Sequence, residues 1–121
     1  MTMLSYQGLG VWQKSFNLTV KVYKITNSFP KHELYGLTSQ MRRASASIPS
    51  NLAEGYGRNH TKEYLQHISI AYGSLCELET QLLLAKELGY ALKEDIELLL
   101  KDASEVGRML NGLKNSLKIK I

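Results

Sequence analysis

Residues 64–85 read YLQHISIAYGSLCELETQLLLA. Apolar side chains return along this stretch at alternating steps of four and three residues, which is the spacing of one face of an α-helix. The members of this row are Tyr64, Ile68, Ala71, Leu75, Leu78, Leu82 and Ala85. The pattern predicts a long helix, at about residues 61–88, that buries one face and leaves the other in water.

The same rhythm occurs in three other segments, which predict helices at about residues 10–28, 33–56 and 92–116. The first carries Val11, Ser15, Leu18, Val22, Ile25 and Phe29. An adjoining row on it, which we also expect in the core, contains Trp12, Phe16, Thr19 and Tyr23. The second carries Leu34, Leu37, Met41, Ala44, Ile48 and Leu52. The last carries Leu92, Ile96, Leu99, Ala103, Val106, Leu110, Leu113 and Leu117.

The four segments are joined by short connections and are not interrupted by an alternating strand pattern or by a repeat of fixed period. They predict an all-α fold, an antiparallel up-down-up-down four-helix bundle. With 121 residues the chain has room for one core, so we expect a single domain over residues 1–121.

Proline, glycine and threonine indicate where the helices bend and end. Pro49 lies inside the second pattern and removes one backbone hydrogen bond, so we expect a kink there rather than an end. The stop is expected at Gly55 and Gly57. We expect the Thr61 hydroxyl to cap the third helix and Gly89 to terminate it.

The composition is that of a soluble globular protein, with 44% hydrophobic and 21% charged residues. No apolar run approaches the roughly 20 residues that cross a bilayer. Met1–Gly10 lacks the pattern of a secretory signal, so we expect a cytoplasmic protein without a membrane partner. Cys76 is the sole cysteine, which excludes an internal disulfide, and we expect it to be a small core residue.

Charge is distributed unevenly along the chain. Residues 1–62 carry a formal net charge of +6, residues 63–105 carry −6 and residues 106–121 carry +4. Positive charge gathered on one surface attracts a polyanion even when the total is only +4, because the local potential governs encounter. The alternative is that the basic and acidic helices neutralise each other, within the fold or between subunits.

The sequence lacks the motifs of several enzyme classes. It contains no Glu-x-x-His pair for a di-metal bundle, no His-Glu-x-x-His, no Walker phosphate loop and no Gly-x-Gly-x-x-Gly. We therefore expect no enzymatic activity, no metal and no cofactor. One metal hypothesis stays as an alternative, because His60, Glu63 and His67 can share a helical face, although three such side chains are usually just solvated.

Residues 40–58 combine small, polar and basic side chains. A polar stripe at helical spacing contains Gln40, Arg43, Ser47, Asn51 and Glu54. One interpretation places Arg43 and Glu54 in buried or interfacial polar networks. The other is a basic, partly aromatic patch that contacts phosphates and stacks on an unpaired base, formed by Arg42, Tyr56, Arg58 and Lys62.

Several strings of the sequence resemble a known family. They are YGLTSQMRRA at residues 35–44, SIPSNLAEG at residues 47–55 and GSLCELET at residues 73–80, together with VWQK at residues 11–14. Over about residues 9–110 the chain resembles the bacterial four-helix bundle proteins encoded within intervening sequences of 23S ribosomal RNA genes. It is also similar to the accessory protein of diversity-generating retroelements.

The resemblance implies an antiparallel four-helix bundle that assembles as a homopentamer. The similarity to the retroelement protein implies a basic surface that associates with a reverse transcriptase and nucleic acid. For the intervening-sequence proteins themselves the resemblance implies no established biochemical role.

We therefore expect a non-enzymatic, oligomeric nucleic-acid-binding protein whose partner is ribosomal or other structured RNA. Repetition of weak phosphate contacts on several subunits would raise the avidity. The candidate contacts are Lys14, Lys21, Lys24, Arg42, Arg43, Arg58 and Lys62. The alternative is a protein-interaction or scaffold subunit without nucleic-acid contact. In this alternative the basic stripe of the first helix, which contains Lys14, Lys21 and Lys24, contacts an acidic helix of a neighbouring subunit.

Overall fold

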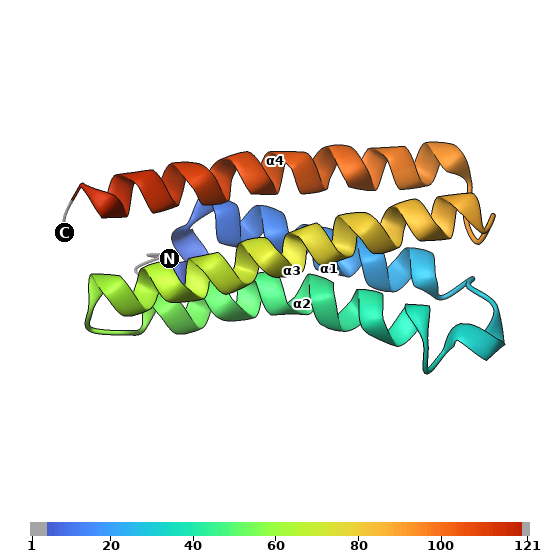
Figure 1. The fold of residues 1–121 in the computed structure, drawn as a ribbon, viewed down its shortest axis with the longest axis horizontal. Helices are drawn as coiled ribbons and strands as arrows, with labels where there is room; N and C mark the ends of the chain where they lie inside the picture. The colour runs from blue at the N-terminus through green and yellow to red at the C-terminus, as the bar shows by residue number, and fades with distance from the viewer. Residues whose placement is uncertain (1–4, 120–121) are drawn as a thin grey trace.

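The computed structural model describes residues 5–119 (Figure 1). Its helices are α1 (Gly10–Thr26), α2 (Leu37–Tyr56), α3 (Thr61–Glu87) and α4 (Lys93–Lys118), with single 3-10 turns η1 (Tyr6–Gly8) and η2 (Lys31–Glu33). The described part of the chain contains no strand, so the predicted all-α arrangement of four helices is confirmed. Among these residues no helix has the length and apolarity needed to cross a membrane. Lys120, which contributes to the predicted basic C-terminal segment, lies outside the described residues.

The four helices lie side by side along one long axis (Figure 1). The colour of the chain runs one way along α1, back along α2, forward along α3 and back again along α4. The apolar rows of all four meet in one core, except that Leu34 and Leu92, which were predicted to belong to these rows, are exposed. Side chains that are almost completely buried there include Leu18, Met41, Ile48, Leu52, Ile68, Leu78, Leu82, Ile96 and Leu110. Each such side chain contributes roughly 1.5–3 kcal/mol by leaving water.

The adjoining row of α1 is not in the core, contrary to the prediction. Phe16 is 46% exposed and Tyr23 is 44% exposed, while Trp12 and Thr19 are half-buried. The reason is the partner helix. Opposite Trp12 and Phe16, α2 presents small side chains such as Ala46, Ser50 and Ala53, which do not cover the rings, and Arg42 contacts the Tyr23 ring but leaves it 44% exposed. The rings therefore line a surface groove.

Cys76 was expected in the core, and this prediction is also wrong. Its side chain is exposed, because Leu75 and Leu78 occupy the buried face of α3 and Cys76 lies one position away from it.

Helix α2 begins four residues later than predicted, at Leu37. The preceding residues form the 3-10 turn η2, and Gly36 has non-helical backbone angles. The Glu33 carboxylate accepts a hydrogen bond from the Leu37 N–H at 3.0 Å and one from the Tyr90 hydroxyl at 2.8 Å. These two bonds lower the pKa of Glu33. Leu34 consequently lies outside the helix and is exposed.

The helix α2 continues through Pro49, as predicted, and the kink at this residue stays a prediction. Gly55 lies inside the helix, and Gly57 follows its last residue. The predicted Thr61 cap is wrong, because His60 occupies the N-cap position and no side-chain hydrogen bond caps α3. Gly89 follows the end of α3 with φ of 71°, in the left-handed region that favours glycine.

At Gly55 the helices α2 and α3 lie close together. A Cβ atom built there would lie 2.8 Å from Cβ of His67 and 2.9 Å from Cδ1 of Tyr64. Both distances are well below van der Waals contact, so only glycine fits without a shift of the helices.

Gly55→Ala is therefore expected to destabilise the protein, although alanine has the higher helix propensity by roughly 0.5–1 kcal/mol. The matched control is Gly112→Ala in α4, where a Cβ would meet nothing within 4 Å, and it should stabilise the fold slightly. Urea unfolding followed by circular dichroism measures both changes. Equal effects of the two substitutions would contradict the proposed steric role of Gly55.

Candidate nucleic-acid interface

The lysines of α1 differ in their surroundings. Lys14 Nζ lies 3.6 Å from Asp102 Oδ1 and 3.1 Å from Glu105 Oε2, and Lys21 Nζ lies 2.8 Å from Asp102 Oδ2. Both lysines are thus paired with carboxylates of α4. For these two residues, the alternative that basic and acidic helices neutralise each other within the fold is therefore correct. Because their charges are balanced, Lys14 and Lys21 attract a phosphate only weakly.

Asp102 is the centre of this cluster. Partial burial alone would raise the pKa of Asp102, but the hydrogen bond from Lys21 and the charges of Lys21 and Lys14 outweigh it and lower the pKa. The carboxylate of Asp102 therefore stays ionised and holds α1 against the middle of α4.

Lys24 is exposed and has no carboxylate within ion-pair distance among residues 5–119. Arg42 lies nearby on α2 and is held by the end of α1. Its Nε donates to the Thr26 hydroxyl at 2.9 Å, and its Nη2 donates to Asn27 Oδ1 at 3.0 Å and to the Tyr23 carbonyl at 3.4 Å. Its guanidinium also lies 4.9 Å from the centroid of the Tyr23 ring. Arg42 thus joins α2 to α1 and keeps a fixed positive charge.

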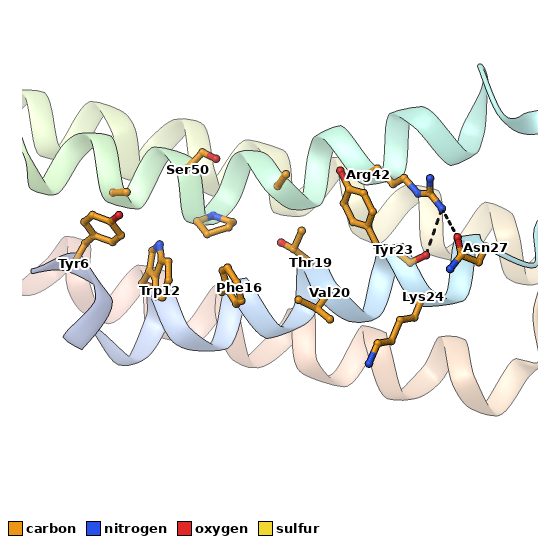
Figure 2. A pocket seen from close by; sticks show the side chains of 13 residues that line it. Tyr6, Trp12, Phe16, Thr19, Val20, Tyr23, Lys24, Asn27, Arg42 and Ser50 are labelled. Atoms are coloured by element: carbon orange, nitrogen blue, oxygen red, sulfur yellow. Dashed lines mark hydrogen bonds between the residues drawn. The ribbon is translucent and has the colours of Figure 1, made fainter. Parts of the chain in front are cut away.

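A groove runs between α1 and α2, with Lys24 and Arg42 toward one end (Figure 2). Its volume is about 680 Å³. The rings of Trp12 and Phe16 stack with centroids 5.0 Å apart, and the Tyr6 ring meets Trp12 edge-on at 5.3 Å. The lining residues, all within the described chain, include no aspartate or glutamate. This groove, called the aromatic groove below, is an apolar surface with positive charge at one end.

Arg43 is exposed on the other side of α2, and it has no hydrogen-bond or ion-pair partner within residues 5–119. It lines a small polar pocket of about 250 Å³ together with Gln40, Ser47, Ser74 and Glu77. Glu77 contributes a negative charge to this pocket, so it does not offer a purely positive surface. Because the side chain of Arg43 lies in solvent, a buried network is excluded for it within this chain, and the interfacial role stays a prediction.

Arg58 and Lys62 lie at the turn between α2 and α3. Arg58 Nε lies 3.8 Å from Glu63 Oε2, a long contact between two exposed groups, and Lys62 is exposed. The Tyr56 ring meets that of Tyr64 edge-on. Arg42 is separated from Arg58 by sixteen residues of α2 and its turn, about 24 Å along a helix, so the predicted patch of Arg42, Tyr56, Arg58 and Lys62 is not one surface.

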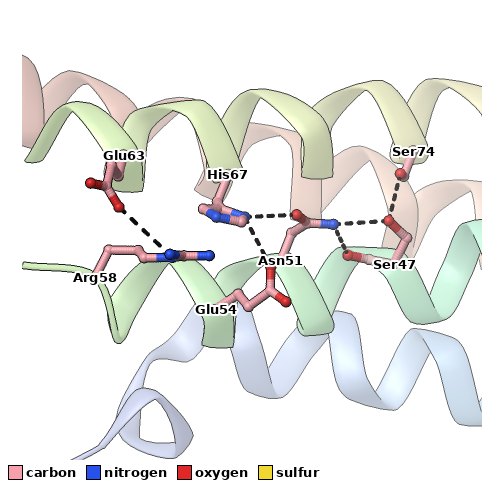
Figure 3. A network of polar contacts seen from close by, with 7 residues as sticks. All are labelled: Ser47, Asn51, Glu54, Arg58, Glu63, His67 and Ser74. Atoms are coloured by element: carbon pink, nitrogen blue, oxygen red, sulfur yellow. Dashed lines mark hydrogen bonds and ion pairs between the residues drawn. The ribbon is translucent and has the colours of Figure 1, made fainter. Parts of the chain in front are cut away.

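The polar stripe of α2 forms a network with α3 (Figure 3). The Asn51 amide donates to the carbonyl and hydroxyl of Ser47 at 2.9 and 3.0 Å, which fixes its orientation. Asn51 Oδ1 then lies 2.9 Å from His67 Nδ1, so His67 Nδ1 carries the proton in this contact. Ser74 donates to the Ser47 hydroxyl at 2.9 Å. Glu54 Oε2 lies 3.5 Å from His67 Nδ1, so Glu54 joins this network, but its side chain is exposed and not buried as one form of the structural interpretation expected.

The alternative metal site is not assembled. His67 faces Asn51 and Glu54, whereas Glu63 contacts Arg58 (Figure 3). Within residues 5–119 no group of three or more His, Cys, Asp or Glu side chains is placed to hold a metal ion.

Two further lysines, which were not among the candidate contacts, lie near the turn between α2 and α3. Lys114 and Lys118 lie in the last turns of α4, and α4 carries no acidic residue from position 106 onward. Because α4 ends where α3 begins (Figure 1), these lysines lie at the same end of the bundle as Arg58 and Lys62. We call these four residues the basic end. The unbroken absence of acids after residue 105 was the sequence signal that could have identified it.

The opposite end of the bundle, at the turn between α3 and α4, is rich in carboxylates. They belong to Glu87, Glu94, Asp95 and Glu97. The side chains of Leu88, Leu92 and Leu98 are exposed beside them. We call this the acidic end.

The fold is a bundle of four helices, and the comparison with known proteins identifies the family to which the chain belongs. Residues 7–112 match the family described as 23S rRNA-intervening sequence protein, so the chain belongs to that family. A solved structure from Bacteroides thetaiotaomicron, described as a protein with unknown function from the S23 ribosomal protein family, is similar with a TM-score of 0.78. It is 22% identical in sequence, and the alignment covers 86% of this chain and 97% of that one. No significant match is found among curated proteins.

Asp102→Asn tests the ion pairs between α1 and α4. Because the folded state lowers the pKa of Asp102, its carboxylate stabilises the fold above the ordinary aspartate pKa of about 4 and loses this effect as the pH falls below that value. We expect the variant to be less stable at pH 7 by at most about 1 kcal/mol, since the lysines are partly exposed. In urea unfolding the difference should shrink as the pH falls through the lowered pKa of Asp102, and a difference independent of pH would contradict the assignment.

Proposed function

We propose that this protein is a non-enzymatic, oligomeric nucleic-acid-binding protein that associates with ribosomal or other structured RNA in the cytoplasm. The observation that carries the proposal is the basic end. Lys62, Lys114 and Lys118 have no carboxylate partner among residues 5–119, and the ion pair of Arg58 is long. Phosphate contacts by unpaired cations release counterions and supply most of the affinity for nucleic acid.

The basic end also refines which candidates we propose as contacts. Arg58 and Lys62 remain leading candidates, and Lys114 and Lys118 join them. Lys24, Arg42 and Arg43 are secondary candidates, because Lys24 and Arg42 line the aromatic groove away from the basic end and Arg43 lies next to Glu77. Lys14 and Lys21 rank last, because Asp102 and Glu105 already neutralise them.

A double variant, Lys62→Gln with Lys118→Gln, tests the basic end. We expect weaker binding to a labelled hairpin RNA, and a slope of log affinity against log salt concentration that is shallower by about 1.5, because two phosphate contacts are lost. The matched control is Lys86→Gln with Lys93→Gln, which removes the same charge near the acidic end. Fluorescence anisotropy at several salt concentrations measures both. Equal losses in the two variants, or no binding by the wild type at low salt, would overturn the proposal.

Assembly of several copies forms the second part of the proposal. The aromatic groove exposes the side chains of Phe16, Val20 and Tyr23, and we propose that this apolar surface contacts a second copy of the chain. The acidic end of a second copy is complementary to it in chemistry, because it combines exposed leucines with carboxylates that suit Lys24 and Arg42. Contact between two different surfaces of the same chain generates a closed ring when the rotation closes. A homopentamer, as the family resemblance implies, is such a ring.

Phe16→Glu tests this assembly. Phe16 is 46% exposed and lines the groove, so we expect the fold to persist while the molecular mass in solution falls to that of a single chain. Ile70→Glu is the control, because Ile70 on α3 is exposed to the same degree (47%) and lies outside the groove. Sedimentation equilibrium gives the masses. An unchanged mass for Phe16→Glu would exclude the groove as the contact between copies.

The ion pairs of Lys14 and Lys21 favour a second candidate function, that of a protein-interaction or scaffold subunit without nucleic-acid contact. In this alternative the remaining positive charge serves contacts between subunits. The similarity to the retroelement accessory protein extends it to a reverse transcriptase as partner. Assembly in solution together with no affinity for RNA at low salt would favour the scaffold over the nucleic-acid-binding protein.

A further inference from the structure

A cavity of about 380 Å³ lies between α3 and α4, and none of the candidate contacts of the sequence analysis lines it. Its lining includes Ser69, Tyr72 and Gly73 of α3 and Asn111 and Lys114 of α4. Its volume falls in the range of about 300–1,000 Å³ that is typical of small-molecule sites. We call it the α3–α4 pocket.

Two glycines shape this pocket. At Gly107 the helices are close, since a Cβ there would lie 3.2 Å from Cδ2 of Leu75 and 3.9 Å from Cε2 of Tyr72. Gly73 lies about half a turn from Leu75, toward the basic end, and a Cβ there would meet nothing within 4 Å. The pocket therefore opens beside the place where α3 and α4 touch, and Gly73 belongs to its lining on the side open to solvent.

The groups around the pocket suit a nucleobase. The Tyr72 ring is 39% exposed and offers a surface for stacking. The Asn111 amide has both a donor and an acceptor, which is the combination needed to pair with the edge of a base. The side chains of Asn111 and Lys114 have no hydrogen-bond or ion-pair partner within residues 5–119, so both are available to a ligand.

The charge around the pocket suits phosphates. Neither α3 from residue 64 to 76 nor α4 from residue 106 to 118 contains an aspartate or glutamate. Lys118 lies one turn beyond Lys114 on α4, and Lys62 lies two turns before Ser69 on the same face of α3. Lysines thus continue from the pocket toward the basic end, so a bound strand could keep its phosphates in contact with positive charge.

We propose that the α3–α4 pocket binds an unpaired nucleobase, so that the preferred ligand of the basic end is single-stranded RNA or an unpaired loop of a structured RNA. This inference rests on the function proposed above and names the class of ligand. A base in a duplex is stacked and paired and cannot enter such a pocket, whereas an unpaired base can be turned into it. The pocket is also smaller than the aromatic groove, which suits a single planar group.

The test compares the full-length wild type with variants that fill or empty the pocket. Gly73→Leu adds a bulky side chain to the lining of the pocket, and Gly112→Leu makes the same change on an exposed face of α4 outside the pocket. Tyr72→Ala removes the stacking ring, and Tyr72→Phe keeps it. Circular dichroism and the solution mass verify that each variant is folded and assembled as the wild type is.

The probes are a labelled oligoadenylate and a labelled RNA hairpin with a fully paired stem and the same number of nucleotides. We expect tighter binding of the oligoadenylate by the wild type and a loss of roughly five- to a hundredfold in Gly73→Leu and Tyr72→Ala. Gly112→Leu and Tyr72→Phe should bind as the wild type does. An oligoadenylate carrying 2-aminopurine should change its fluorescence on binding to the wild type and not to Gly73→Leu.

The outcomes separate this inference from the proposed function. If both probes bind with steep salt dependence and Gly73→Leu binds like Gly112→Leu, the pocket assignment is overturned while the nucleic-acid-binding function stands. If neither probe binds at low salt, both are overturned. A preference for the paired hairpin would likewise overturn the assignment of an unpaired base.

Discussion

The packing of α2 against α3 at Gly55 is the constraint on which the surfaces of this protein depend. The missing side chain lets the helices approach until Tyr64 and His67 fill the space beside it. At that spacing Asn51 reaches His67, which orients the polar stripe of α2 toward α3. The small residues on the far side of α2 then face the rings of α1 and leave the aromatic groove between them. The turn after α2 then lies at the same end of the bundle as the end of α4, and together they form the basic end.

Pairing within the fold, rather than the amount of charge, decides where positive potential remains. Lys14 and Lys21 belong to the row of lysines on α1, yet they are neutralised by ion pairs with Asp102 and Glu105. The last turns of α4 carry fewer cations but have no acids among them. A surface whose lysines have no carboxylate partner attracts a polyanion more strongly than a richer stripe that is already neutralised. The paired lysines between α1 and α4 therefore serve the fold, whereas the unpaired lysines at the basic end are available to a ligand.

Periodicity made the buried rows predictable, because the step of four and three reports which side of a helix avoids water. It could not place Phe16 or Tyr23, since their exposure depends on the side chains of α2 opposite them. Nor could it pair Lys21 with Asp102, which lies 81 residues away in the chain. The start of α2 was missed because a side-chain contact, from Glu33 to Leu37, replaced the expected first turn. The sequence already shows that residues 106–121 contain no acidic residue, which could have predicted a basic surface there. Only the direction of α4 in the structure shows that this segment lies at the same end of the bundle as Arg58 and Lys62.

The acidic and basic ends give the bundle an electric moment along its longest dimension. A polyanion acts on this moment at distances up to about a Debye length, before any side chain is in contact, and turns the molecule so that the ends of α4 and α2 lead. Encounters then begin within a narrow range of orientations, which shortens the rotational search that usually slows specific association. For a rod-shaped bundle, the arrangement of charge thus acts first on the rate of arrival and only afterwards on the strength of the complex.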